Sequence, residues 1–178
     1  VAAREPGGTP ISEKIRALLL DPANDEMTDE CELLLYEASR AQLVRQVIGP
    51  AIARGAAVVC DRFYDSTYAY QAGARGLADD LVRHANELGR CGLVPDVTLV
   101  LDVDPELAFS RLASDGLDRL EEEGLAFQAR VRAGYLRLAA EEPERVRVVD
   151  AAGGPGEVAA RIMGELAALV PGEACDRG

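Results

Sequence analysis

Hydrophobic residues follow two different periodicities along the chain. A short continuous apolar run occurs at 56–60, and two further short, mostly apolar segments occur at 97–103 and 146–149. Such runs are typical of strands that are buried on both faces, as in a parallel sheet. Residues 1–4 have the pattern of the end of a further strand, before the turn-forming cluster 5–10. The pattern therefore predicts four strands.

Longer stretches between these runs have helical periodicity. The expected helices span residues 12–20, 28–54, 66–88, 105 to about 114, 120–140 and 156–170. Ser12 and Thr28 are the expected N-caps of the first two helices, and Gly55 is expected to end the second. Strands that alternate with helices predict an α/β fold with a parallel sheet and right-handed crossovers. We expect one domain over residues 1–170 and a frayed tail at 171–178.

Composition narrows the choice of function. The chain has 178 residues and a net charge of −12, with 48% hydrophobic and 28% charged residues, which is typical of a folded globular domain. The negative charge disfavours binding to nucleic acids, although a few arginines could still hold a small phosphorylated ligand. Four scattered cysteines and one histidine favour reduced thiols over a zinc site. No apolar run approaches the length of a membrane span and no signal peptide is recognised, so we expect a cytoplasmic protein.

Candidate chemistry lies at the carboxyl ends of the predicted strands, where ligands bind in open α/β sheets. Asp61 and Arg62 follow the run 56–60, and they could hold a metal-bound water and a phosphate, or simply form an ion pair. The turn Arg4-Glu5-Pro6-Gly7-Gly8-Thr9 follows the first strand and should lie at the same edge, as a ligand-binding or an ordinary turn.

Two further groups lie on the predicted helices. Tyr36 and Arg40 are four residues apart on one helix face, where they could stack on a base and read its edge or merely pack. Hydroxyl and amide side chains follow Asp61 and Arg62 closely in the sequence: Ser66, Thr67, Tyr70 and Gln71.

Together these segments resemble the bacterial thymidylate kinases. The resemblance rests on the turn at 4–9, the Asp-Arg-Phe…Ser-Thr-x-Ala-Tyr-Gln run at 61–71, and the segments at 95–96, 101–103 and 117–121, and it extends from Val1 to about Asp150. It implies a three-layer α/β/α fold of the P-loop nucleoside monophosphate kinase type. It also implies phosphoryl transfer from ATP, accompanied by Mg²⁺, to dTMP for dTTP synthesis.

The resemblance implies a role for each matching position. Arg62 would hold the phosphate of dTMP, and Asp61 would act on the metal indirectly, next to the transferred phosphoryl group. Tyr36 would stack on thymine, and Arg40 would donate to its 4-oxo group, a position where cytosine offers a donor and is rejected. The other implied substrate-binding residues are Arg4, Glu5, Pro6, Arg16, Ser66, Thr67, Tyr70 and Gln71.

The sequence departs from this family at two places. It has no G-x-x-x-x-G-K-[ST] motif, since its one lysine, Lys14, is preceded by Glu13 and followed by Ile15. We therefore expect a chain without the N-terminal strand, phosphate loop and helix, with unpaired edges on the neighbouring strands and negligible kinase activity by itself. The lid expected at about 111–121 has the implied catalytic residues Arg111 and Arg119 at its flanks but no arginine between them.

Two alternatives remain open from the sequence, a non-catalytic nucleotide-binding relative and a kinase for another nucleoside monophosphate. The family also suggests a homodimer through the long helix 28–54. That helix has more apolar positions than one core face needs, among them Leu33, Leu34, Leu43, Val44, Val47 and Ile48.

Overall fold

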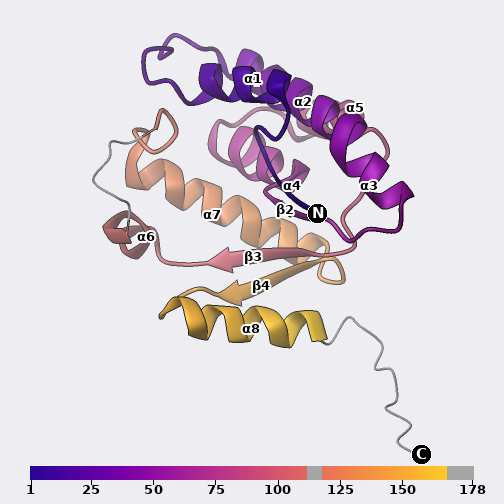
Figure 1. The fold of residues 1–178 in the computed structure, drawn as a ribbon. Coiled ribbons are helices and arrows are strands. Elements are labelled where there is room, and N and C mark those ends of the chain that lie inside the picture. Colours follow the sequence, from indigo (N-terminus) through magenta and orange to yellow (C-terminus); the bar gives the residue numbers. More distant parts are fainter. Residues whose placement is uncertain (112–117, 168–178) are drawn as a thin grey trace, which may run out of the picture.

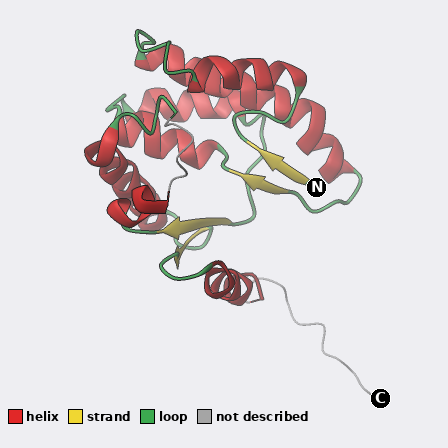
Figure 2. Ribbon diagram, turned by 60° about the vertical axis from the view of Figure 1, so that its left-hand side comes forward, coloured by secondary structure: helices red, strands yellow, loops and turns green. Residues whose placement is uncertain are grey.

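The computed structural model describes residues 1–111 and 118–167 and confirms an α/β fold with parallel strand pairing. The strands are β1 (Ala2–Arg4), β2 (Val59–Asp61), β3 (Thr98–Asp102) and β4 (Val146–Asp150). β1 pairs with β2, with Ala3 opposite Cys60, and β3 pairs with β4, with Val100 opposite Val148. The predicted single sheet is therefore two separate parallel pairs, which lie apart in Figure 2. Within the described residues, each of the four strands pairs with one other strand only, so each has an unpaired edge.

Helices pack against both strand pairs. They are α1 (Pro10–Leu20), α2 (Asp29–Leu43), α3 (Gly49–Ala53), α4 (Tyr64–Thr67), α5 (Asp79–Gly89), α6 (Pro105–Arg111), α7 (Gly124–Glu141) and α8 (Pro155–Ala167), together with the π-helical segments η1 (Val44–Ile48) and η2 (Tyr68–Ala74). The β3–β4 pair lies between α7 and α8, which makes this part a three-layer arrangement (Figure 1). None of the described helices is long and apolar enough to cross a membrane.

The start of α1 differs from the prediction. Thr9, not Ser12, is the N-cap, and its hydroxyl oxygen accepts a hydrogen bond from the Ser12 N–H at 3.0 Å. Pro10 at the first helical position explains the earlier start, because its fixed φ suits a helix and it has no N–H to satisfy. The Ser12 hydroxyl instead donates to the Ser39 carbonyl at 2.9 Å, which attaches α1 to α2. The Thr28 cap of α2 is confirmed.

The long helix predicted over 28–54 is not a continuous α-helix. After α2 it widens into η1, in which the Gly49 N–H donates to the Val44 carbonyl five residues earlier, and it continues as α3. Pro50 supplies the reason, because it cannot donate within an α-helix and its ring clashes with the carbonyl four residues before it. The helix predicted over 66–88 is also divided, into α4, η2 and α5. Gly76, with a φ of 83°, lies in the turn before α5.

The prediction that the strands are buried on both faces is wrong for β2. Cys60 packs beneath the long helix in a cluster with Leu43, Val44 and Ile48, whereas Val59 on the opposite face is 75% exposed. This alternation follows from covering only one face of a two-stranded sheet. The thiols of Cys31, Cys60 and Cys91 are free, as expected, whereas Cys175 lies outside the described residues.

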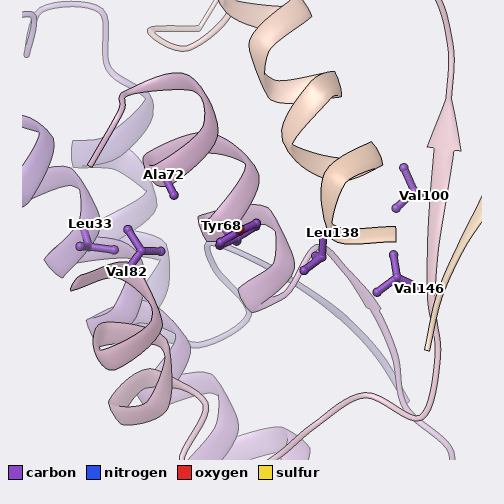
Figure 3. Close-up of a cluster of buried hydrophobic side chains, with 7 residues drawn as sticks. All are labelled: Leu33, Tyr68, Ala72, Val82, Val100, Leu138 and Val146. Carbon is purple, nitrogen blue, oxygen red and sulfur yellow. The ribbon is translucent and has the colours of Figure 1, made fainter. Parts of the chain in front are cut away.

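The largest buried cluster connects the two halves of the molecule. It is formed by Leu33, Tyr68, Ala72, Val82, Val100, Leu138 and Val146 (Figure 3). These side chains come from α2, η2 and α5 on one side and from β3, α7 and β4 on the other. The segment η2 therefore lies in the core between the two groups of elements.

Candidate functional site

A narrow polar pocket lies beside the ends of β1 and β2. Its walls are formed by Glu5, Tyr36, Arg40, Arg62, Phe63, Ser66, Thr67, Tyr70 and Gln71. All of these except Phe63 were assigned to the site from the sequence. The cavity volume is about 10 Å³, close to that of one water molecule, so a larger ligand can enter only when side chains move.

Local structure explains how these residues meet. The Glu5 N–H donates to the Asp61 carbonyl at 2.9 Å, which joins the turn after β1 to the end of β2. Tyr36 and Arg40 are one turn apart on α2, and α2 packs against both α1 and α5. Arg62 has a φ of 66°, an unusual conformation for a residue with a side chain, at the point where β2 turns into α4. This geometry places segments distant in sequence around one cavity.

Arg40 is held by four partners. Its Nε donates to Glu5 Oε2 at 2.7 Å, its Nη2 donates to Thr67 Oγ1 at 2.8 Å, and its Nη1 donates to Asn86 Oδ1 at 3.1 Å and to Glu37. The side chain is 1% exposed. A guanidinium has five N–H groups, so one N–H on Nη2 is left to donate to a ligand.

Two buried carboxylates share the charge of Arg40. Burial, the largest effect, raises the pKa of Glu5 to about 7, although the Arg40 charge and hydrogen bond lower it. The negative charge of Glu37 adds to the increase. Within residues 1–111 and 118–167, Glu5 Oε1 and Glu37 Oε2 are buried without hydrogen-bond partners. The cluster therefore has more acceptor capacity than its donors fill, which favours a protonated Glu5 near neutral pH.

Gln71 forms the opposite polar wall. Its side chain is 1% exposed, and its Nε2 donates to Glu32 Oε1 at 2.8 Å. Glu32 is equally buried and also accepts hydrogen bonds from Arg75 and Arg119. Burial raises the pKa of Glu32, but these hydrogen bonds and the Arg75 charge outweigh burial and lower it overall. Glu32 therefore remains an ionised acceptor.

Arg62 lies at the boundary between this pocket and a larger cavity. Its guanidinium lies 4.9 Å from the centre of the Tyr70 ring, and both residues line the two cavities. The larger cavity has a volume of about 320 Å³ and includes the ion pair between Arg132 and Asp102, 2.6 Å apart, at the end of β3. Arg62 therefore borders both cavities. From this position it could contact a chemical group that is transferred between a ligand in one cavity and a ligand in the other.

Aromatic side chains support this boundary. The Tyr70 ring meets the rings of Phe127 and Tyr135 edge-on. The Tyr135 hydroxyl donates to Ser66 Oγ at 2.6 Å, and burial raises the pKa of Tyr135 to about 12, so it stays protonated. These contacts fix α7 against η2 next to the pocket.

Other predicted site residues lie outside the pocket lining. Arg4 pairs with Glu13 at 3.0 Å, and Arg16 donates to the Pro6 carbonyl at 2.9 Å, so these three predicted residues support the turn after β1. Asp61 is exposed, and within the described residues no ion pair involves its carboxylate. Among residues 1–111 and 118–167, no group of three acidic, histidine or cysteine side chains could hold a metal ion.

The two predicted lid arginines, Arg111 and Arg119, do not line the pocket, and their hydrogen bonds go to different partners. Arg111 donates to the carbonyls of Ala151 and Gly153, both at 3.1 Å, after β4. Arg119 is 7% exposed and donates to Glu32 and to the Leu19 carbonyl. The expected lid between them falls mainly on residues 112–117, which lie outside the described residues, as does the expected tail 171–178.

Sequence reasoning missed several residues that hold the pocket in shape. Phe63 lies 5.6 Å below the Arg40 guanidinium, and its position next to Arg62 was the available signal. Glu32 lies at helical spacing from Tyr36 and Arg40, so reading the whole face of α2 would have found it. Asn86 gives no local signal, because its contact with Arg40 spans 46 residues.

A parallel α/β fold that gathers arginines and hydrogen-bonding side chains at the carboxyl ends of its strands defines a class of proteins that bind small anionic ligands. The family model described as Thymidylate kinase matches residues 1–162. Thymidylate kinase from Desulfosudis oleivorans is 51% identical over 174 residues, covering 93% of this chain and 81% of that protein. Thymidylate kinase from Ectopseudomonas mendocina is 46% identical over 178 residues, covering 98% and 83%.

A solved structure gives the same result. The crystal structure of thymidylate kinase from Ehrlichia chaffeensis aligns with a TM-score of 0.74 at 31% identity, covering 94% of this chain and 79% of that one. The chain belongs to the thymidylate kinase family. It is accordingly an enzyme of the dTMP kinase type, a phosphotransferase with dTMP and ATP as substrates, and the resemblance seen in the sequence is confirmed.

Proposed function

We propose that the polar pocket binds the thymine base of dTMP and that Arg62 holds its phosphate at the boundary with the larger cavity. The observation that carries this proposal is the convergence of eight sequence-predicted residues on one pocket. Tyr36 would stack on the base, and the free N–H of Arg40 would donate to the 4-oxo group. Thr67 and Gln71 would contact the base edge, Ser66 would support the turn, and Tyr70 would pack against the deoxyribose.

Phosphoryl transfer would take place where the two cavities meet. ATP would approach from the side of the larger cavity, and Arg62 would stabilise the negative charge that develops on the transferred group. The exposed carboxylate of Asp61, which pairs with no cation in the described part of the chain, fits a hydrogen bond to a water ligand of Mg²⁺. The metal would neutralise charge on the phosphates. Arg111 and Arg119 would act at the flanks of the lid, and Arg4, Glu5, Pro6 and Arg16 would keep the turn after β1 in place.

The outward face of α2 supports a homodimer. Cys31, Leu34 and Ala38 follow one another at helical spacing, are exposed, and carry no charge. Of the apolar positions that suggested a dimer in the sequence, Leu34 is 65% exposed, whereas the structure uses Leu33, Leu43, Val44 and Ile48 in the core. Pairing of two copies through this face would remove these apolar groups from water. The cytoplasmic location expected from the sequence stays a prediction.

Calorimetric titration with dTMP, thymidine and dCMP tests the assignment of the pocket. The unaltered chain is expected to bind dTMP and to discriminate against dCMP. Arg62→Met should weaken dTMP binding about tenfold or more, because a charge-assisted hydrogen bond is lost, and should leave thymidine binding within about twofold. Arg54→Met removes an exposed arginine outside the pocket and serves as the matched control. An equal loss for dTMP and thymidine would show that Arg62 does not hold the phosphate.

A further inference from the structure

Glu32 is a buried carboxylate that the proposed mechanism does not use. It lies on α2 at the spacing i, i+4, i+8 with Tyr36 and Arg40, yet it is not part of the pocket lining. It is 1% exposed. A carboxylate this deeply buried requires partners for its charge, and here they come from two other segments of the chain, the end of η2 and the region of Arg119.

The hydrogen bonds to Glu32 fill its acceptor capacity. Oε1 accepts from Gln71 Nε2 at 2.8 Å and from Arg75 Nε at 3.2 Å. Oε2 accepts from Arg75 Nη2 at 3.0 Å and from Arg119 Nη2. A carboxylate has about four lone-pair sites and no proton to donate, so all four sites are in use.

An acceptor of this kind determines how the Gln71 amide is oriented. The NH₂ group must face Glu32, because a carbonyl oxygen in that place would meet a carboxylate oxygen with no proton between them. Gln71 Oε1 is left on the other branch of the amide. Within the described residues only the NH₂ group of Gln71 has a hydrogen-bond partner, so Oε1 is the polar atom that Gln71 can offer to the pocket it lines.

We propose that Glu32 is a positioning residue that holds the Gln71 amide with its oxygen toward the pocket, so that the pocket selects a pyrimidine whose N3 carries a hydrogen. This inference rests on the proposed function, in which the pocket binds a pyrimidine base. Thymine and uracil donate from N3–H, whereas cytosine has an acceptor at N3. Glu32 would therefore add to specificity without touching the substrate, by a contact separate from the Arg40 donor.

The Glu32→Gln variant tests this orientation. The oxygen of the new amide at position 32 is expected in the place of Glu32 Oε2, where Arg75 and Arg119 both donate. The NH₂ of that amide then faces Gln71. Gln71 would then turn its own oxygen toward this NH₂ and its own NH₂ toward the pocket. The ratio of the dissociation constants for dCMP and dTMP, measured by calorimetry, should fall about tenfold or more. A change of this size is expected when a donor replaces an acceptor at a buried polar site.

Three further variants separate orientation from stability. Glu32→Asp keeps an acceptor-only partner, and Arg75→Gln weakens the ion pair while leaving the Glu32 carboxylate in place, so both should keep the ratio within about threefold even where affinity falls. If circular dichroism shows that Glu32→Gln is unfolded, the double variant E32Q/Q71E, which retains one carboxylate and an acceptor facing the pocket, should keep the preference for dTMP.

The outcomes distinguish the two proposals. If Glu32→Gln lowers the affinities for dTMP and dCMP by the same factor, or if Arg75→Gln reduces the ratio as much as Glu32→Gln does, Glu32 is only structural and the inference is overturned. Loss of the preference in the double variant has the same meaning. If the unaltered chain itself fails to bind dTMP or to prefer it, the proposed function fails first.

Discussion

Arg40 and Glu32 lie two turns apart on α2, and each is surrounded by partners of opposite character. Arg40 donates to Glu5, Thr67, Asn86 and Glu37, and Glu32 accepts from Gln71, Arg75 and Arg119. Each buried charge is thus neutralised by neighbouring groups. Removing one partner would leave an unpaired charge in the low-dielectric interior. Between the two clusters, the pocket presents a donor from one side and an acceptor from the other.

Glu5 makes the stability of the protein depend on pH. Its pKa rises from 4.5 in the unfolded chain to about 7 in the fold, mainly through burial. The folded state therefore binds the proton more tightly. The stabilisation from protonated Glu5 is fully present below pH 4.5 and is lost as the pH rises to about 7.

We expect this effect to disappear in Glu5→Gln. Between pH 4.5 and 7.5, the free energy of unfolding of the unaltered chain should fall relative to that of the variant by an amount on the order of 3 kcal/mol. Urea unfolding at several pH values measures the difference. Glu13→Gln is the control, because the Gly8 N–H and Arg4 lower the pKa of Glu13 below 4.5, so its contribution is lost only at lower pH and should stay nearly constant over this range. A difference that is constant with pH would show that Glu5 does not titrate in this range.

At the scale of elements, the backbones of α7 and η2 lie close together at Gly134 and Ala69. A Cβ on Gly134 of α7 would lie 2.9 Å from the Cα of Ala69 and 3.0 Å from its carbonyl oxygen. These are backbone atoms and cannot turn away as a flexible side chain would. The absence of a side chain at Gly134 therefore lets α7 pack directly on η2, beside Tyr70.

Gly134→Ala is expected to destabilise the fold. The overpacking should cost about 1–3 kcal/mol, more than the gain in helix propensity of about 1 kcal/mol. Gly164→Ala in the exposed part of α8, where none of the described residues lies near an added Cβ, should stabilise the protein by up to about 1 kcal/mol. Thermal or urea unfolding of both variants measures the two effects. Equal stabilisation by both alanines would rule out the close contact.

At the scale of the whole molecule, the two strand pairs are held together by side chains. Asp65 after β2 is 2% exposed and accepts two hydrogen bonds from Arg145, at 2.7 and 2.8 Å, next to β4. Thr98 of β3 donates to the same carboxylate at 2.7 Å. Together with the cluster around Tyr68, this ion pair fixes the pocket on one strand pair relative to the cavity at the end of the other.

The proposed homodimer predicts a change of mass on a single substitution. Leu34→Glu places a charge on the outward face of α2 and should convert a dimer to a monomer in analytical ultracentrifugation. The free energy needed to bury that unpaired charge exceeds the free energy gained from the apolar contact. Leu88→Glu is the matched control, since Leu88 is 80% exposed on α5 and should leave the mass unchanged. A monomeric unaltered chain, or dissociation by both variants, would argue against pairing through α2.

The sequence alone predicted the order of the elements, the parallel strands, the family and eight of the nine pocket residues. Motifs such as Asp61-Arg62 followed by Ser66-Thr67 are local, and the carboxyl ends of parallel strands meet at one edge whatever the details of packing. Apolar periodicity likewise located the helices. It did not show where π-helical segments interrupt them. Pro50 was a local signal for the first interruption that apolar periodicity does not register, whereas η2 lies in the packed core.

Only the tertiary structure decided how the side chains pair. Glu32 and Gln71 are 39 residues apart and Arg40 and Asn86 are 46 apart, so no local pattern connects them. The family resemblance placed Arg119 at a flank of the lid, and only the fold shows that Arg119 also donates to the buried carboxylate of Glu32. The sequence by itself determined which groups are available at the end of the strands. Their orientation follows from which distant donors fill the acceptors of Glu5, Glu37 and Glu32, and that is decided only when the chain folds.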